Sequence, residues 1–274
     1  MKNIHKYGKI PLFGGVKLDK DFLSAVIVTY NNGEKAEKAC KSILENTKRY
    51  DVTLYVIDNA SSDNTVDLLS KIEGVKVIKQ EKNLGFGKAH NKILKLPMGK
   101  YHFVVNPDIV IDSDVLSDMA DVMNENDDLV LTMPNILNTD GTVQYLPKEI
   151  PTFKRLFGGR LASFSKRFAD LRADYTWENK KINGITDINF CSGCFFCIRS
   201  QVFKNLCGFD ERYFMYLEDA DLTVRAKNFG RVAILPDISV THEWERESAK
   251  SFKYLLIHLI SSFKFLLKWR KITK

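Results

Sequence analysis

Short apolar runs alternate with amphipathic segments through the first half of the chain. Unbroken apolar, β-branched runs predict buried strands over 23–30, 53–57, 75–78, 101–105 and 129–133. Apolar residues at helical spacing predict helices over 35–47, 65–72, 87–96 and 113–126. This alternation predicts parallel βαβ units, and therefore a three-layer α/β/α sheet. Because ligands of such sheets bind beyond the carboxyl ends of the strands, we look for function in the polar turns there.

The second half of the chain is less regular. Residues 147–182 are basic and aromatic, with apolar residues at helical spacing over 153–171. This segment predicts an ordinary core helix, a second membrane contact beside that of the tail, or a lid over a binding site. Strand-like runs follow over 187–198, 231–235 and 238–240, with a helical segment over 219–228.

The last segment predicts one long helix. Apolar residues from Phe252 to Leu267 recur at helical spacing, and lysines fall largely on the opposite side. A basic amphipathic helix of this kind suits the headgroup layer of an anionic membrane. The alternative is a helix docked on the body or on a partner subunit, with solvated lysines. We therefore divide the chain into a domain over 1–247, with an N-terminal extension over 1–21 and an insertion over 147–182, and a tail helix over 248–274.

The net charge of +7 belongs to that tail. Seven of the 41 Lys and Arg residues follow Glu247 and no acid does, which leaves 34 basic against 34 acidic residues in the body. A nucleic-acid binder driven by charge is the alternative that the total alone would suggest. The location of the charge instead favours a membrane surface as the partner.

The composition indicates a packed globular protein of a reducing compartment. The chain is 45% hydrophobic and 27% charged, which excludes a disordered chain. Five cysteines are too few for a disulfide framework, and no signal peptide or membrane-spanning run is apparent. We expect a cytoplasmic protein, peripheral at the inner face of the cell membrane.

Four polar turns follow successive predicted strands. They are Thr29-Tyr30-Asn31-Asn32, Asp58-Asn59-Ala60-Ser61-Ser62-Asp63, Asn83-Leu84-Gly85-Phe86-Gly87 and Asn106-Pro107-Asp108. Any one of them could be ordinary turn chemistry, since Asn, Asp and Gly are the usual turn formers. Four at the successive strand ends of one sheet indicate a binding site.

With a later Leu217-Glu218-Asp219-Ala220-Asp221-Leu222, these motifs resemble those of the family 2 glycosyltransferases over about residues 22–245. The Asn106-Pro107-Asp108 triplet and the preceding Asn83–Phe86 segment are most similar to a rhamnosyltransferase-like subgroup. The resemblance implies the GT-A fold, a nucleotide-sugar-binding sheet and transfer with inversion at the anomeric carbon.

The resemblance also implies a donor site at the strand ends. Asp58 would contact the nucleoside, with Thr29, Tyr30 and Asn31 on the neighbouring loop. Asn83, Gly85, Phe86, Asn91 and Asn106 would complete the nucleotide-sugar site. Asp108 matches the metal ligand of the family, and a late histidine, His242, is a second candidate ligand, with a structural histidine as its alternative. Mg²⁺ or Mn²⁺ suits such ligands. Asn106 replaces the first acid of the usual triplet, so we expect weaker metal binding.

The acidic cluster after the last loop is the candidate catalytic centre. An inverting transfer needs one carboxylate to take the proton of the acceptor hydroxyl. The family motif places this base at Asp219, with Glu218 as the alternative. Asp221 is expected on the acceptor side, orienting the helix through hydrogen bonds. The structural alternative is acidic residues favoured by a helix dipole. Ser192 and Gly193 are expected beside the acceptor.

Two further patterns are interpreted as structural. Cys191, Cys194 and Cys197 have spacing typical of a metal site, but a strand-like run would turn the three thiols to different faces. His90 and His102 have no catalytic context.

These observations predict a metal-assisted inverting glycosyltransferase. Its donor would be a nucleoside diphosphate sugar, plausibly dTDP-rhamnose, and its acceptor a glycan or lipid-linked oligosaccharide in bacterial surface polysaccharide synthesis. The alternative is a catalytically silent nucleotide-sugar-binding or scaffold protein of the same fold. A Rossmann oxidoreductase is excluded because no G-x-G-x-x-G opens the first helix.

Overall fold

The computed structural model describes residues 22–158, 165–243 and 252–273. The N-terminal extension over 1–21, part of the insertion and the start of the tail lie outside the described residues. One mixed sheet runs through the molecule, in the order β3-β2-β1-β4-β8-β6-β9-β5, with β7 paired to β9.

The first half of the sheet is parallel, as predicted. β1 (Phe22–Thr29) lies between β2 (Asp51–Asp58) and β4 (Tyr101–Val105), and β3 (Val75–Lys79) extends the edge beyond β2. The connections are α1 (Gly33–Asn46), α2 (Thr65–Leu69), α3 (Phe86–His90) and the 3₁₀ turn η1 (Asn91–Lys95). The carboxyl ends of these strands therefore meet at one edge, where the polar turns lie.

The second half departs from the parallel prediction. β8 (Phe195–Arg199) runs antiparallel to both β4 and β6 (Leu129–Leu137), whereas β6 and β9 (Arg231–His242) are parallel. The two runs predicted over 231–240 form this single strand β9, with an irregular register beside Pro134. Short strands β5 (Ile109–Val110) and β7 (Thr186–Asp187) pair with β9. An apolar run specifies burial and not strand direction, so this arrangement could not be predicted from periodicity.

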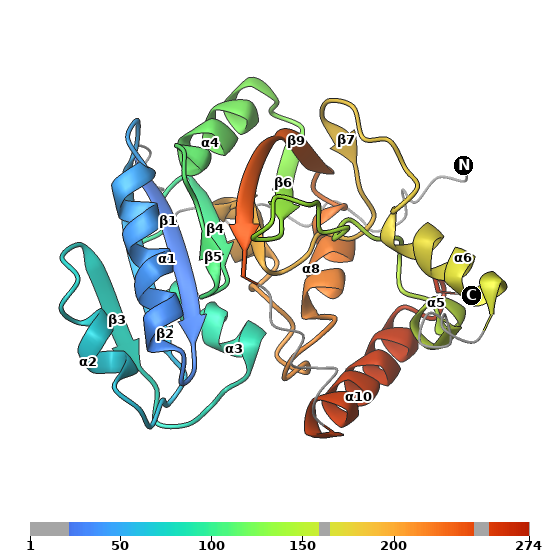
Figure 1. Cartoon of the computed structure of the whole chain (residues 1–274), viewed down its shortest axis with the longest axis horizontal. Helices are drawn as coiled ribbons and strands as arrows, with labels where there is room; N and C mark the ends of the chain where they lie inside the picture. The colour runs from blue at the N-terminus through green and yellow to red at the C-terminus, as the bar shows by residue number, and fades with distance from the viewer. Residues whose placement is uncertain (1–21, 159–164, 244–251, 274) are drawn as a thin grey trace.

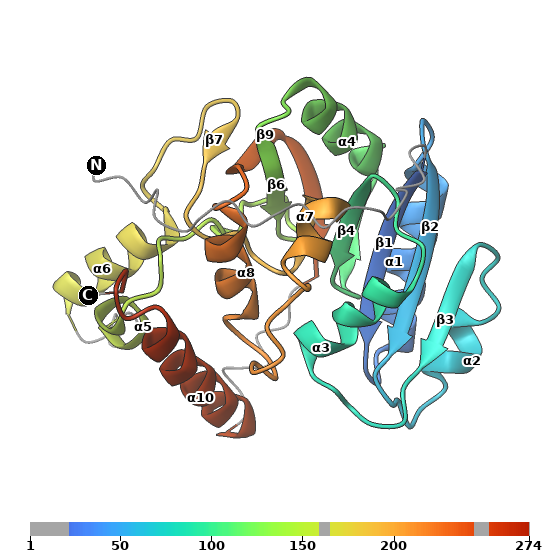
Figure 2. The same cartoon turned by 180° about the vertical axis from the view of Figure 1, so that it is seen from behind.

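Helices cover both faces of the sheet, which gives the three layers that were expected. Figure 1 shows α1 in front of β1 and β2, with α4 (Val115–Glu125) near the top. Figure 2, from behind, shows α3, α7 (Ser200–Asn205) and α8 (Glu218–Ala226) on the other side. The basic insertion forms two short helices, α5 (Phe153–Gly158) and α6 (Lys166–Thr176), where one pattern had been expected over 153–171.

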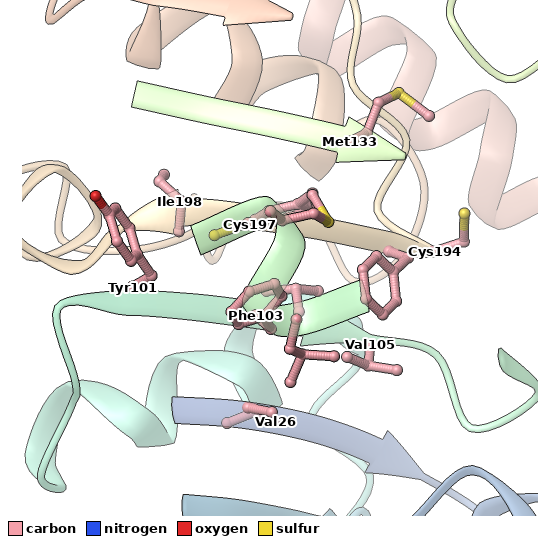
Figure 3. Packing of buried hydrophobic residues seen from close by; sticks show 14 of the residues in the cluster. Val26, Tyr101, Phe103, Val105, Met133, Cys194, Cys197 and Ile198 are labelled. Carbon is pink, nitrogen blue, oxygen red and sulfur yellow. The ribbon is translucent and has the colours of Figure 1, made fainter. Parts of the chain in front are cut away.

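The core fills the space between sheet and helices with aromatic and β-branched side chains. Figure 3 shows Val26, Phe103, Val105 and Ile198 among them. Cys194 and Cys197 both belong to this core, and Cys194 lies just before the start of β8. The described residues include no group of three His, Cys, Asp or Glu side chains that could hold a metal ion.

The tail helix α10 (Phe252–Lys268) docks on the body beside α8 (Figures 1 and 2). Phe265 is fully buried, in a cluster with Leu156, Phe190, Tyr213, Leu217 and Ala220. Lys268 pairs with Asp210 and Asp221, and Ser261 donates a hydrogen bond of 2.7 Å to the carbonyl of Met215. Lys268 thus faces the body, where the sequence pattern had placed the lysines in solvent. Among the described helices, none is long and apolar enough to cross a membrane.

Candidate active site

The turns after β1 and β2 are joined by hydrogen bonds. Asp58 is fully buried, and its carboxylate accepts the amide hydrogen of Ser61 at 3.1 and 3.3 Å. The amide of Asn31 donates to the Ser61 hydroxyl at 2.8 Å, and the Asn31 side-chain oxygen accepts from the amide of Ser62 at 2.8 Å. Thr29 is buried beside them, and Tyr30 is about half exposed. The predicted nucleoside residues therefore lie together.

Asn59 joins the third turn to this group. Its amide nitrogen donates to the side chain of Asn83 at 3.0 Å and to the carbonyl of Gly85 at 3.2 Å, and its oxygen accepts from the amide of Leu84 at 2.8 Å. Asn59 was not among the predicted site residues, although the turn that contains it was. Its contacts fix the backbone of Asn83–Gly85 against the end of β2.

A cavity of about 430 Å³ lies next to these turns. This volume falls within the usual range for small-molecule sites. The predicted residues that line it come from five separate segments of the chain: Phe86, Asn106, Asp108, Ser192, Gly193, Glu218, Asp219 and His242. The structure thus brings the candidate metal ligands and the candidate base to one space.

Asp108 and His242 meet at the end of the antiparallel pair β5–β9. The Nε2 atom of His242 lies 3.3 Å from Oδ1 of Asp108, and Nδ1 of His242 lies 3.0 Å from the side-chain oxygen of Gln144. Gln144 therefore orients the ring, a contact that sequence patterns did not predict. Oδ1 of Asp108 is buried and has no hydrogen-bond partner among the described residues. A buried oxygen without a hydrogen-bond partner is suited to bind a metal ion or another external ligand.

The candidate base stands at the start of α8. One carboxylate oxygen of Asp219 accepts the amide hydrogen of Gly193 at 2.9 Å, and the other accepts that of Ala220 at 2.8 Å. Burial raises the pKa of Asp219, while the Gly193 amide and the charge of Lys148 oppose that rise. A raised pKa in a cavity is a recognised property of catalytic acids and bases.

Glu218 differs from its neighbour in its surroundings. Burial and the charge of Asp219 raise the pKa of Glu218 well above its ordinary value. Its Oε2 atom is buried without a hydrogen-bond partner in the described chain. Because two amides and a lysine favour the charged form of Asp219, the proton of the pair belongs on Glu218 and the negative charge on Asp219.

The loop before α8 has a strained backbone. Tyr216 and Leu217 both adopt left-handed conformations, with φ of 71° and 65°, and both line the cavity. Such conformations cost non-glycine residues roughly 1–3 kcal/mol each and persist where the surroundings impose them. The Phe86 amide donates to the carbonyl of Phe214 at 2.8 Å, which ties this loop to the third turn. Gly85, with φ of +80°, allows the approach, because a Cβ there would lie 2.1 Å from that carbonyl oxygen.

Two predicted residues have contacts away from the cavity. The Asn91 side chain clamps the backbone of Phe209, donating to its carbonyl at 2.9 Å and accepting from its amide at 2.8 Å. Asp221 is fully buried and accepts from Arg225 at 2.7 Å and from the Trp269 ring nitrogen at 2.8 Å. Asp221 is thus bonded within α8 and to the tail, and its carboxylate faces α10.

Two lysines line the cavity that no motif indicated. Lys35 comes from α1, and Lys148 comes from the segment after β6. Lysines in a basic chain give no sequence signal of their own, because most of them are solvated. Only the folded arrangement separates these two from the others.

The chain is similar to a known protein family and to proteins of known structure. A model of glycosyl transferase family 2 matches residues 24–207. The N-acetylglucosaminyl-diphospho-decaprenol L-rhamnosyltransferase of Mycobacterium tuberculosis (strain ATCC 25618 / H37Rv) is 26% identical over 262 residues, covering 90% of this chain and 84% of the relative.

Two solved structures show the fold. The structure of GalNAc-T7 with UDP, GalNAc and Mn²⁺ superposes with a TM-score of 0.65 at 16% identity, over 92% of this chain and 48% of that one. Staphylococcus aureus TarS 1-349 in complex with UDP-GlcNAc gives a TM-score of 0.60 at 19% identity, over 89% and 66%. The chain thus spans about half the length of the first and two thirds of the second.

The fold and the cavity at its strand ends define a glycosyltransferase with the GT-A fold. The chain belongs to glycosyl transferase family 2.

Proposed function

We propose that this protein is an inverting transferase that moves a sugar from a nucleoside diphosphate donor to a hydroxyl group of an acceptor glycan. The observation that carries the proposal is the position of Asp219, a buried carboxylate held by the Gly193 amide in the same cavity as Asp108 and His242. A base and a candidate diphosphate-binding pair in one cavity are the two parts that a single displacement needs.

The chemistry follows from these two parts. Asp219 takes the proton of the acceptor hydroxyl as the hydroxyl oxygen forms a bond to the anomeric carbon of the donor sugar. The bond from that carbon to the donor diphosphate breaks in the same step, and the electron pair leaves with the nucleoside diphosphate. Because attack and departure occur on opposite faces, one carboxylate suffices and the configuration inverts. Protonated Glu218 is placed to donate a hydrogen bond to a substrate oxygen through its otherwise unpartnered carboxyl group.

A divalent cation fits beside Asp108. The buried Oδ1 atom and the neighbouring His242 ring offer two ligands, and Asn106 lines the same space. Mg²⁺ and Mn²⁺ are often held by one or two carboxylates together with substrate phosphates, and they neutralise the charge of a departing diphosphate. The described residues include no group of three His, Cys, Asp or Glu side chains that could hold a metal alone. We therefore expect a metal that binds together with the donor.

Rhamnose and a lipid-linked acceptor are the substrates we favour. The support is the mycobacterial relative, whose name describes an L-rhamnosyltransferase acting on N-acetylglucosaminyl-diphospho-decaprenol. The donor would be dTDP-rhamnose, and the product would belong to bacterial surface polysaccharide synthesis. A silent binding protein of the same fold is disfavoured by the intact arrangement around Asp219.

We place the outward face of α10 against an anionic membrane surface. Docking buries Phe265 and leaves a stripe of apolar side chains in solvent: Phe252, Leu256, Ile260, Phe263 and Leu267. Lys253, Lys264, Arg270 and Lys271 are exposed on the same segment, and no acidic residue occurs over 252–273. An apolar stripe with only cations around it matches anionic lipid headgroups better than a mixed protein surface.

The first experiment measures nucleoside diphosphate release from dTDP-rhamnose and UDP-GlcNAc, with and without EDTA. We expect release from one donor, loss of at least a hundredfold in Asp219→Asn, and little change in Asp127→Asn, a matched control on the surface. EDTA and Asp108→Asn should each lower the rate. Absence of release from every donor tested would favour the silent binding protein.

A second experiment measures cosedimentation with vesicles. Wild-type protein should bind vesicles that contain phosphatidylglycerol more tightly than vesicles of phosphatidylcholine. The double variant Phe252→Ser/Leu267→Ser, which alters only highly exposed side chains, should lose this binding and keep donor hydrolysis. Equal binding by both proteins would exclude the stripe as the contact.

A further inference from the structure

Lys148 occupies a position in the cavity that the proposed mechanism leaves unused. It pairs with Phe190 through an isolated antiparallel bridge, and its ammonium nitrogen lies 5.1 Å from the centre of the Phe190 ring. Both residues line the cavity that contains Glu218 and Asp219. The lysine therefore lines the cavity from the start of the insertion.

The charge of Lys148 is poorly compensated. Burial lowers its pKa, while the charge of Asp219 favours the ammonium form. Among the described residues, no carboxylate lies within ion-pair distance of its nitrogen. The adjacent acid, Glu149, is already bonded to Lys180 at 2.7 Å and to the ring nitrogen of Trp177 at 2.8 Å. A half-buried cation without a paired anion indicates a place for an anionic ligand.

The position of Lys148 indicates that this anion belongs to the acceptor and not to the donor. The carboxylate that acts on Lys148 is Asp219, the group assigned to the acceptor hydroxyl, whereas the candidate diphosphate site of the donor is at Asp108 and His242. A phosphate one sugar ring away from the reacting hydroxyl would come within reach of a lysine. Phe190 lies beneath the ammonium and supports it at the wall of the cavity.

We propose that Lys148 and Phe190 form an acceptor subsite, in which the Lys148 ammonium binds the phosphate that links the acceptor sugar to its carrier. This subsite rests on the proposed transfer reaction. It makes the enzyme selective for a sugar diphosphate acceptor over an uncharged glycoside of the same sugar. Lysine binds such a phosphate as a compact point charge.

The alternative role for Lys148 is electrostatic support of the base alone. A lysine that only favours ionised Asp219 would affect every acceptor equally, because the base acts on the hydroxyl and not on the phosphate. Its removal would also move the acidic limb of the rate profile to higher pH, since the charge that stabilises the anion would be lost. The two roles can therefore be distinguished by whether the effect of removing Lys148 depends on the acceptor.

The experiment compares two acceptors with the donor that the wild-type protein uses. One is GlcNAc joined through diphosphate to a short prenyl chain, and the other is octyl β-GlcNAc. In Lys148→Met we expect the KM for the diphosphate acceptor to rise about ten- to hundredfold more than the KM for octyl β-GlcNAc, while the loss of support for ionised Asp219 affects both acceptors alike. Lys148→Arg should restore most of the affinity. Lys154→Met, at an exposed position nearby, serves as the matched control.

Three results would overturn the subsite. They are an equal loss on both acceptors, an unchanged KM for the diphosphate acceptor, and a loss that Lys148→Arg does not repair. Lys148→Gln gives the same comparison should the methionine variant fail to fold. Hydrolysis of the donor in the absence of an acceptor is measured alongside. If the wild-type protein does not hydrolyse the donor, both the proposed transfer reaction and the subsite are excluded. If the wild-type protein hydrolyses the donor but Lys148→Met affects both acceptors equally, the subsite alone is excluded.

Discussion

Lys268 is the residue on which the docking of α10 depends most. Its ammonium nitrogen lies 2.7 Å from the carboxylate of Asp210 and 2.5 Å from that of Asp221, and its side chain is 20% exposed. Asp221 is fully buried at the back of α8. Lys268→Met keeps most of the aliphatic stem and removes the charge, so the change tests the ion pairs rather than the packing.

The expected cost follows from the partners that remain. Removing one member of a buried ion pair costs about 3–5 kcal/mol, because a charge is left buried and uncompensated. Asp221 retains Arg225 and the ring nitrogen of Trp269, and Lys268 is partly solvated, so we expect about 2–3 kcal/mol. With an m-value of about 3 kcal/mol per molar urea, the unfolding midpoint should fall by roughly 0.7–1 M.

Urea unfolding followed by circular dichroism measures this change. Lys271→Met removes the same charge from an exposed position of the same segment and should shift stability by less than about 0.5 kcal/mol. Asp221→Asn combined with Lys268→Met should recover part of the loss, since the unpaired charge is then gone. Equal stabilities of Lys268→Met and Lys271→Met would refute the reasoning, and so would a double variant weaker than the sum of its single changes.

Three further predictions concern pH and backbone geometry. Burial lowers the pKa of His102 to about 3 and that of His90 well below its ordinary value, so both stay neutral when folded. As the pH falls, the two histidines take up protons in the unfolded state and not in the folded state. The free energy of unfolding measured by urea titration should therefore fall by about 2 kcal/mol from pH 6.5 to 5.5, and a constant free energy would contradict this. The acidic limb of the kcat/KM profile should lie above the pKa of an ordinary aspartate, because burial raises that of Asp219. Gly85→Ala should destabilise the protein by more than about 2 kcal/mol, because the added carbon would clash with the carbonyl of Phe214. Gly141→Ala, with a similar φ but no described atom within 4 Å of the added carbon, should show only the cost of the backbone conformation. Equal melting temperatures of the two variants would exclude the clash.

The sequence was sufficient for the first half of the fold. β4 was predicted with its observed bounds, and the other early strands lie within a few residues of theirs, because each is a buried apolar run between polar turns. The antiparallel β8 could not be predicted, since the order of strands depends on which apolar faces meet after the chain has folded. The tail was predicted as one long helix, but the docking face of α10, with two serines and Lys268, does not follow from hydrophobic spacing.

The site divides in the same way. Asp108 and Asp219 could be proposed from the sequence because each lies in a contiguous motif. Gln144 and Lys148 lie on a segment with no motif, and only the fold brings Gln144 to His242 and Lys148 to the cavity. Asn91 was assigned to the donor pocket by its motif, yet its amide is used to clamp the backbone of Phe209, a contact across 118 residues of sequence.

The docking of α10 has a consequence for how the protein matures. Every described residue that lines the cavity precedes α10 in the chain, yet Ser261 and Phe265 hold the strained loop that carries Tyr216 and Leu217. During synthesis the sheet and its strand-end turns can fold while α10 is still inside the ribosome. The loop that carries Tyr216 and Leu217 is then fixed last, so a nascent or prematurely terminated chain would hold the strand-end turns without this finished wall of the cavity.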